Sequence, residues 1–163
     1  MPTIAVTGHM DLTEASVPLV RDALRETLKP HTAAGDLTGL SCIAKGSDSI
    51  FAEVVLELGG SLIAVIPSKD YRQNKVKPDH KDTFDHLTAA ASTVVVLDHE
   101  TANRAAYEDA NNTLLERADR LVAVWNGEPP SGKGGGTADT VLDARSAGMP
   151  VDVVWPNGAA RKG

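Results

Sequence analysis

Short runs of β-branched and apolar residues recur along the whole chain, and their length is typical of strands. They cover residues 3–8, 37–44, 61–67, 92–98, 120–127 and 150–156. Most of these runs are apolar at nearly every position instead of every second one. Near-continuous apolar strands are typical of a parallel sheet whose two faces are both covered.

Stretches with helical character separate these runs, at residues 13–31, 47–60, 78–91, 101–118 and 137–147. In the first of them, the spacing i, i+3, i+7 and i+11 places four apolar residues near one face of a helix: Val17, Val20, Leu24 and Leu28. Regular alternation of strand and helix predicts an α/β domain. We therefore expect a single doubly wound, mostly parallel sheet of about six strands with helices on both faces, which is a Rossmann-like fold. The domain should cover residues 1–158, followed by a flexible tail at 159–163.

Composition narrows the class of protein. The chain has 163 residues and a formal net charge of -6, which favours one compact domain and argues against a nucleic-acid-coating surface. Cys42 is its sole cysteine, which excludes an internal disulfide and fits a reducing compartment. No signal peptide is apparent at the N-terminus, and no apolar run approaches the roughly 20 residues that span a bilayer. We expect a cytoplasmic protein that binds neither nucleic acid nor membrane.

In an open parallel sheet, ligands bind beyond the carboxyl ends of the strands, so the turns after the strands are the places to search. Glycine-bearing turns follow three of the expected strands, at residues 7–11, 44–49 and 126–137. A further segment, residues 68–81, is long, polar and basic. It could be a flap over the site or a solvated loop.

The third turn, "NGEPPSGKGGGT", nearly matches a P-loop. Gly127, Gly132 and Lys133 satisfy the glycine and lysine spacing, but Gly134 stands where a P-loop has Ser or Thr for the magnesium ion. We therefore do not expect a P-loop NTPase.

A better interpretation of this turn is an anion-binding loop. The backbone N–H groups of Gly134, Gly135 and Gly136 would surround a phosphate, with Thr137 as the N-cap of the next helix and Lys133 adding a positive charge. A flexible connector ahead of a helix is the alternative.

Taken together, the segments "VTGHMDL" (6–12), "AKGSDSIFAE" (44–53) and "RADRLVAVWNGEPPSGKGGGTADTV" (117–141) resemble the SLOG superfamily of Rossmann-like nucleotide-derivative binders. That group includes the lonely-guy cytokinin phosphoribohydrolases, also misnamed lysine decarboxylases, and the Rossmann domain of DNA-processing protein A. The resemblance covers the chain in order, and it implies a homo-oligomer, a dimer or larger, with an interface through the helices in residues 78–118.

The "GSD" at residues 46–48 is similar to a family element in which glycine lets the backbone approach a ligand and acidic residues face its sugar. The resemblance implies that Gly46, Ser47 and Asp48 bind the ligand, with Glu53 as a further acidic candidate. Helix capping by Asp48 and a solvated surface charge at Glu53 are the alternatives. Five positions separate the two carboxylates, which places them about 140° apart around a helix and weakens a paired acid/base role.

The lonely-guy enzymes carry a proline- and glycine-rich element that ends in a catalytic glutamate. When Gly136 and Thr137 are aligned with its last glycine and threonine, Thr140 stands at the glutamate and Asp139 lies one residue short. Cleavage of an N-glycosidic bond needs a carboxylate held against the sugar. Loss of that glutamate favours binding without hydrolysis, although Asp139 or Glu53 could replace it.

Several other residues have open roles. Gly8 and His9 follow the first strand, where His9 could contact a ligand, act as a general acid or cap the turn. Tyr107, Asn111 and Asn112 could point into the ligand crevice or lie on an exposed helix face. Two tryptophans, at 125 and 155, are expected in the core. The histidine spacing supports no metal site.

These observations leave two functional hypotheses. The first is a binding protein for a nucleotide or nucleotide-derived phosphorylated metabolite, with phosphate on residues 134–137 and no cofactor required. The second is a nucleotide N-glycosidase or phosphoribohydrolase that releases a free base. Neither the base nor the occurrence of turnover follows from the sequence.

Overall fold

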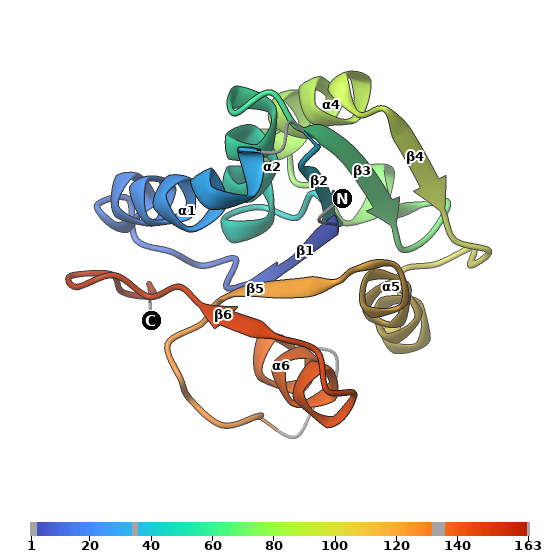
Figure 1. Cartoon of the computed structure of the whole chain (residues 1–163). Coiled ribbons are helices and arrows are strands. Elements are labelled where there is room, and N and C mark those ends of the chain that lie inside the picture. Colours follow the sequence, from blue (N-terminus) through green and yellow to red (C-terminus); the bar gives the residue numbers. More distant parts are fainter. Residues whose placement is uncertain (1–2, 34–35, 132–135, 163) are drawn as a thin grey trace.

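The computed structural model describes residues 3–33, 36–131 and 136–162. Its strands are β1 (Thr3–Gly8), β2 (Thr38–Ser41), β3 (Ser61–Ile66), β4 (Thr93–Val96), β5 (Arg120–Val124) and β6 (Val151–Val153). Its helices are α1 (Ser16–Thr32), α2 (Ser47–Glu57), α3 (Tyr71–Asn74), α4 (Pro78–Ala90), α5 (Arg104–Arg117) and α6 (Thr137–Ser146). The strands form one parallel sheet with helices on both faces (Figure 1). The predicted fold class is therefore confirmed.

The strand order places a switch point at the centre of the sheet. The order is β4-β3-β2-β1-β5-β6. The chain thus builds the sheet outward from β1 in one direction as far as β4, and then returns to add β5 on the other side of β1. Where the connections after two neighbouring strands run to opposite faces of the sheet, a crevice opens at the carboxyl ends of those two strands. The site is therefore expected between the ends of β1 and β5.

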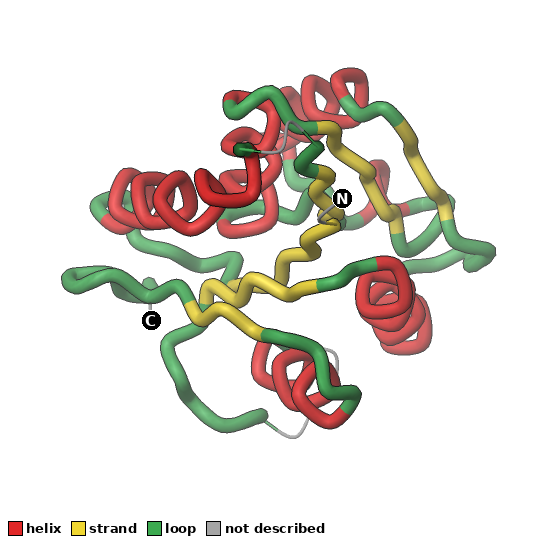
Figure 2. Tube along the Cα trace, in the orientation of Figure 1, coloured by secondary structure: helices red, strands yellow, loops and turns green. Residues whose placement is uncertain are grey.

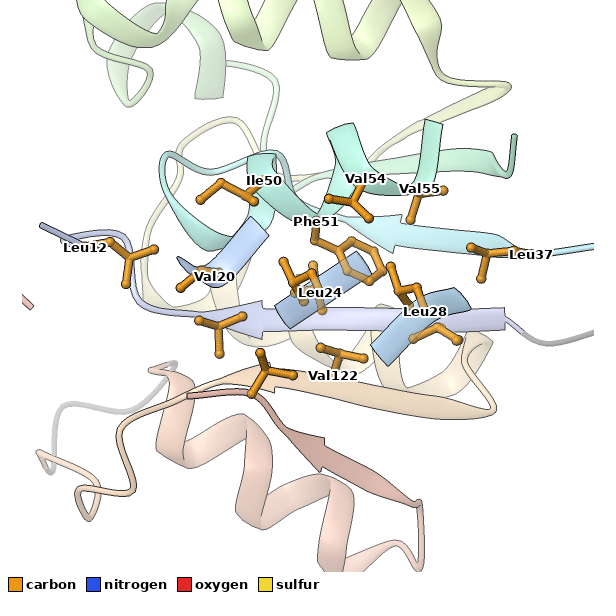
Figure 3. Packing of buried hydrophobic residues seen from close by; sticks show 14 residues of the cluster. Leu12, Val20, Leu24, Leu28, Leu37, Ile50, Phe51, Val54, Val55 and Val122 are labelled. Carbon is orange, nitrogen blue, oxygen red and sulfur yellow. The ribbon is translucent and has the colours of Figure 1, made fainter. Parts of the chain in front are cut away.

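One face of the sheet is covered by α1 and α2. Val20, Leu24 and Leu28 of α1 are fully buried and pack with Phe51 of α2 and Val122 of β5 (Figure 3). The four-residue spacing seen in the sequence is what brings these α1 side chains to one face. This packing places the start of α2 beside the end of β1.

The opposite face is covered by α5 and α6. Ala110 and Leu114 of α5 and Ala144 of α6 pack on Leu40, Leu121 and neighbouring strand residues. Small residues at the contact let both helices lie close to the sheet. The first turn of α6 lies at the carboxyl ends of the strands and lines the cavity described below.

Several expected elements end earlier than predicted. The strands predicted over residues 37–44, 92–98, 120–127 and 150–156 keep only their central residues as strand. Of the residues that follow the shortened strands, Cys42, Ala44, Trp125 and Asn126 line the cavity described below.

The basic segment at residues 68–81 is neither an extended flap nor a simple loop. It contains α3 and the first turn of α4. The Asp70 carboxylate accepts hydrogen bonds from the Ser68 hydroxyl, the Asn74 side chain and the Ala102 backbone N–H. Tyr71 is buried beneath it. These contacts hold the segment against the rest of the domain.

Residues 159–162, predicted to form part of a flexible tail, return to the segment after β1 (Figure 2). The Ala160 N–H donates to Ser16 Oγ at 2.8 Å, and the Lys162 N–H donates to the Asp11 carbonyl at 2.7 Å. Arg161 forms an ion pair with the Asp11 carboxylate at 2.8 Å. These contacts place Arg161 beside the carboxyl end of β1.

Candidate functional site

A cavity of about 660 Å³ lies at the carboxyl ends of β1 and β5. Its walls come from the turns after β1, β2 and β5, from one face of α5, and from the first turn of α6. This volume is within the range of small-molecule sites, which is roughly 300–1,000 Å³. The cavity occupies the switch point that the strand order predicts.

His9, directly after β1, contacts Asn126, which follows β5. His9 Nε2 lies 3.2 Å from Asn126 Oδ1, and the Asn126 backbone N–H donates to the same ring nitrogen at 3.2 Å. The ring also meets Trp155 edge to face, with centroids 5.6 Å apart. His9 is buried and is one of the cavity wall residues.

The two contacts of His9 Nε2 require different positions of the ring proton. Nε2 without a proton accepts from the Asn126 N–H, whereas Nε2 with a proton donates to Asn126 Oδ1. Burial, followed by the charge of Arg161, lowers the pKa of His9 below its usual value. The neutral form is therefore favoured near pH 7.

Close packing explains why glycine stands at Gly8 and Gly46, in the turns after β1 and β2. A Cβ atom at Gly8 would lie 2.4 Å from Ser47 Cβ, and one at Gly46 would lie 2.8 Å from the Met10 carbonyl oxygen. Gly46 also has a φ of 84°, which side-chain-bearing residues rarely adopt. Ser47 Oγ donates to the His9 carbonyl at 2.8 Å. Gly8 lines the cavity, whereas Gly46 and Ser47 hold the turn behind it.

Asp48, in the first turn of α2, lines the cavity. Cys42, Tyr71 and Tyr107 line it as well, from other elements. Burial raises the pKa of Asp48 to about 7. It also raises the pKa of the Cys42 thiol well above its usual value, with the nearby Asp48 adding to the effect. Near neutral pH, this wall presents a carboxyl group between its two protonation states, a thiol and two phenols.

Glu53, the other acidic candidate on α2, is not among the residues that line the cavity. It turns toward α1 and forms an ion pair with Arg21 at 3.4 Å. The helical period places it about 140° from Asp48, which explains why the two carboxylates do not meet. The structure thus gives no support to the expectation of Glu53 as a catalytic residue.

The first turn of α6 forms the opposite wall, through Gly136, Thr137, Ala138 and Asp139. Our assignment of Thr137 as the N-cap is wrong, because Gly136 is the N-cap and Thr137 is the first helical residue. Asp139 Oδ2 accepts from the Gly136 N–H at 3.1 Å and so caps the helix itself. A carboxylate is favoured there by the helix dipole.

Three residues of the expected phosphate loop, Lys133, Gly134 and Gly135, lie outside the described residues. The sequence left the roles of three residues of α5 open. Tyr107 and Asn111 line the cavity, whereas Asn112 is exposed. The two lining residues are one helical turn apart and so share a face.

Sequence reasoning missed two further residues of the site. Trp125 lines the cavity, donates through Nε1 to the Glu128 carbonyl at 3.0 Å, and lies beneath the Arg145 guanidinium. Arg161 lines it as well. Trp125 was expected in the core because it ends an apolar run, and no local pattern indicated that the end of the chain returns to β1.

Among residues 3–33, 36–131 and 136–162, no group of three or more His, Cys, Asp or Glu side chains is arranged to hold a metal ion. Within the same ranges, no helix has the length and apolar character needed to cross a membrane.

Comparison with known protein families and with curated protein sequences found no match. Solved structures do match. DNA processing protein A from Streptococcus pneumoniae is 18% identical with a TM-score of 0.65, covering 93% of this chain and 49% of that one. The chain therefore spans about half the length of that protein.

Two further structures are similar. DNA processing protein A from Helicobacter pylori, studied for its single-stranded DNA binding mode, is 16% identical with a TM-score of 0.64, covering 98% of this chain and 68% of that one. The molybdenum cofactor carrier protein from Chlamydomonas reinhardtii is 21% identical with a TM-score of 0.55, covering 92% and 74%. At these identities the likeness establishes the fold alone. The chain therefore shares the Rossmann-like fold of these proteins.

Proposed function

We propose that this protein binds a nucleotide or a nucleotide-derived phosphorylated metabolite in the cavity between the ends of β1 and β5. The observation that carries the proposal is the position of that cavity, at the switch point of the sheet and against the N-terminus of α6. Exposed N–H groups at a helix N-terminus favour an anion. The phosphate would lie there, with the glycine-rich residues 134–137 around it.

The rest of the cavity wall suits the sugar and base. The Asp48 carboxylate can accept hydrogen bonds from ribose hydroxyls, and Tyr107, Asn111 and Trp125 offer polar groups and aromatic faces. No cofactor is needed for such binding. The ligand is therefore expected to lie across the cavity from α6 to α2.

A matched pair of variants at Thr137 tests the phosphate position. Thr137→Glu adds a negative charge in the first turn of α6, where it favours the helix but repels a phosphate. Thr137→Gln adds similar volume without charge. We would measure the melting temperature with AMP, ADP, ADP-ribose, NAD, ribose 5-phosphate and adenosine, because a ligand that binds only the native state raises it.

Phosphorylated ligands should stabilise the wild type and Thr137→Gln, but not Thr137→Glu. Adenosine, which lacks the phosphate, should have a much smaller effect. If no compound of the series stabilises the wild type, the proposed function fails. If Thr137→Glu responds as the wild type does, the phosphate does not lie at α6.

A nucleotide N-glycosidase is the second candidate, and one observation favours it. A carboxyl group with a pKa of about 7 lines the cavity at Asp48, and general acid/base catalysts work best when their pKa is near the operating pH. Asp139, the candidate that the sequence suggested, also lines the cavity, but it caps α6. Release of free base from nucleoside monophosphates, measured by chromatography, decides between binding and turnover.

We also propose that the partner is a small molecule and not nucleic acid. The net charge of -6 opposes a surface that follows a phosphate backbone. Two structural neighbours are DNA processing proteins, so a labelled single-stranded oligonucleotide belongs in the test. Anisotropy that rises at physiological salt would contradict this part of the proposal.

A further inference from the structure

A second cavity of about 270 Å³ adjoins the main one. Met10, Asp11, Ala44, Tyr71 and Lys75 line both cavities. The two cavities are therefore close neighbours, near enough for one ligand to be proposed in both.

Lysines from three separate parts of the chain surround the smaller cavity. Lys45 lies in the turn after β2, Lys75 and Lys77 lie between α3 and α4, and Lys162 belongs to the returning C-terminal segment. Among the lining residues, Asp11 is the one acidic side chain. Four positive charges around one small cavity are unexpected in a chain whose net charge is -6.

Most of this positive charge is not neutralised by neighbouring carboxylates. Lys45 forms an ion pair with Asp79 at 2.7 Å, and Asp11 is already paired with Arg161 at 2.8 Å. Within the described ranges, Lys75, Lys77 and Lys162 form no ion pair. Like charges held close together repel one another, and an anion between them relieves that repulsion.

The segment that carries Lys75 and Lys77 is held in place. Val76 between them is buried, and the Lys75 and Val76 N–H groups donate to the Tyr71 carbonyl at 2.8 and 3.1 Å. Buried His80 lies on the same wall, where its Nε2 is 3.0 Å from the Ile43 carbonyl oxygen. The two lysines that line the cavity from this segment are thus carried by a fixed backbone.

We propose that the smaller cavity binds a second anionic group, a phosphate or a carboxylate, of the ligand whose first phosphate lies at the N-terminus of α6. This inference rests on the proposed function and narrows its ligand class to nucleotide derivatives with two separated anionic groups. Lys75, which lines both cavities, stands where the two parts of the ligand join. The basic segment singled out in the sequence thereby gains a role in binding.

The first test uses inorganic pyrophosphate, which needs no nucleotide site. We would measure its affinity by isothermal titration calorimetry for the wild type, Lys75→Gln/Lys77→Gln, Thr137→Glu and Lys29→Gln/Lys69→Gln. The last variant is the matched control, because it removes two exposed lysines that line neither cavity. Circular dichroism and melting temperature establish that each variant is folded.

The affinity should fall about tenfold or more in Lys75→Gln/Lys77→Gln and by less than about twofold in the control, because screened charges remote from a site contribute little. Thr137→Glu should retain binding. No binding to the wild type, or binding lost in Thr137→Glu alone, would overturn the inference. If pyrophosphate behaves as expected while no nucleotide binds, the lysine site stands as an anion site and the proposed function fails.

The second test compares AMP with adenosine 3′,5′-bisphosphate. Lys75→Gln/Lys77→Gln should lower the affinity for the bisphosphate by about tenfold and change the affinity for AMP by less than about twofold. The reason is that only the bisphosphate carries a second phosphate that reaches the lysines. Equal losses for both compounds would mean that the lysines hold the first phosphate. That result would contradict the two-anion ligand class.

Discussion

Gly8, the last residue of β1, packs directly against Ser47, the first residue of α2. A Cβ atom at Gly8 would lie 2.4 Å from Ser47 Cβ and 2.9 Å from Val124 Cβ. The two turns that line and support the cavity are thus fitted to each other, and the glycine is required by this contact.

Gly8→Ala is therefore expected to destabilise the protein by about 1–3 kcal/mol, because an added methyl group in a packed interior must displace its neighbours. Urea denaturation measures the change. Gly136→Ala is the control, since the nearest atom to its Cβ would be Asp139 Oδ2 at 3.4 Å. Gly8→Ala/Ser47→Gly should recover part of the loss. Equal stability of the wild type and Gly8→Ala would refute this account of the contact.

The raised pKa of Asp48, about 7, makes stability depend on pH. Between about pH 4 and 7 the folded protein holds a proton that the unfolded chain releases, so this contribution to stability is complete below about pH 4 and is lost as the pH rises through 7. Asp48→Asn cannot ionise. It should be more stable than the wild type by roughly 1–3 kcal/mol at about pH 8 and similar to it at about pH 4.

The measurement is the free energy of unfolding of both proteins at several pH values. Because His9 titrates in both proteins, its contribution cancels in the difference. A difference that stays constant with pH would show that Asp48 has an ordinary pKa in the folded protein.

Asp139 separates the two functional hypotheses. Its carboxylate caps α6 at Gly136, so Asp139→Ala should cost about 0.5–2 kcal/mol of stability. Removal of its negative charge beside the proposed phosphate should also strengthen nucleotide binding, by about threefold to tenfold, through the electrostatic effect at a helix N-terminus. Calorimetric titration with AMP measures this change. If the protein is a glycosidase that uses Asp139, the variant should bind nucleotide and release no base.

The exposed edge of the sheet suggests where a second copy of the chain could bind. Val94 and Val96 of edge strand β4 are 45% and 51% exposed, and they lie within the region 78–118 in which we expect a homo-oligomer interface. Val94→Lys/Val96→Lys should convert a dimer to a monomer, because edge charges oppose association. Light scattering after size exclusion gives the mass. A wild type that is monomeric at high concentration would contradict the expected dimer.

The sequence alone determined the fold class and the general location of the site. Apolar runs and helical spacing such as Val20, Leu24 and Leu28 are local patterns, and a strand–helix alternation leads to a parallel sheet with its ligand site at the carboxyl ends. Tyr107, Asn111 and Asn112 could also be proposed as crevice residues, because asparagine is mildly unfavourable inside a helix. The first two line the cavity and Asn112 is exposed. These inferences depend on periodicity and propensity, which need no knowledge of distant contacts.

Only the tertiary structure decided which residues form the cavity walls. Gly46 and Ser47 are near the site in sequence but support it from behind, and Glu53 turns toward Arg21 because of its position around α2. The return of Arg161 and Lys162 to the end of β1, and the approach of Lys75 and Lys77 to the turn after β2, are contacts between distant parts of the chain. Such contacts depend on how layers pack, and that packing is set by the whole core and not by any local pattern.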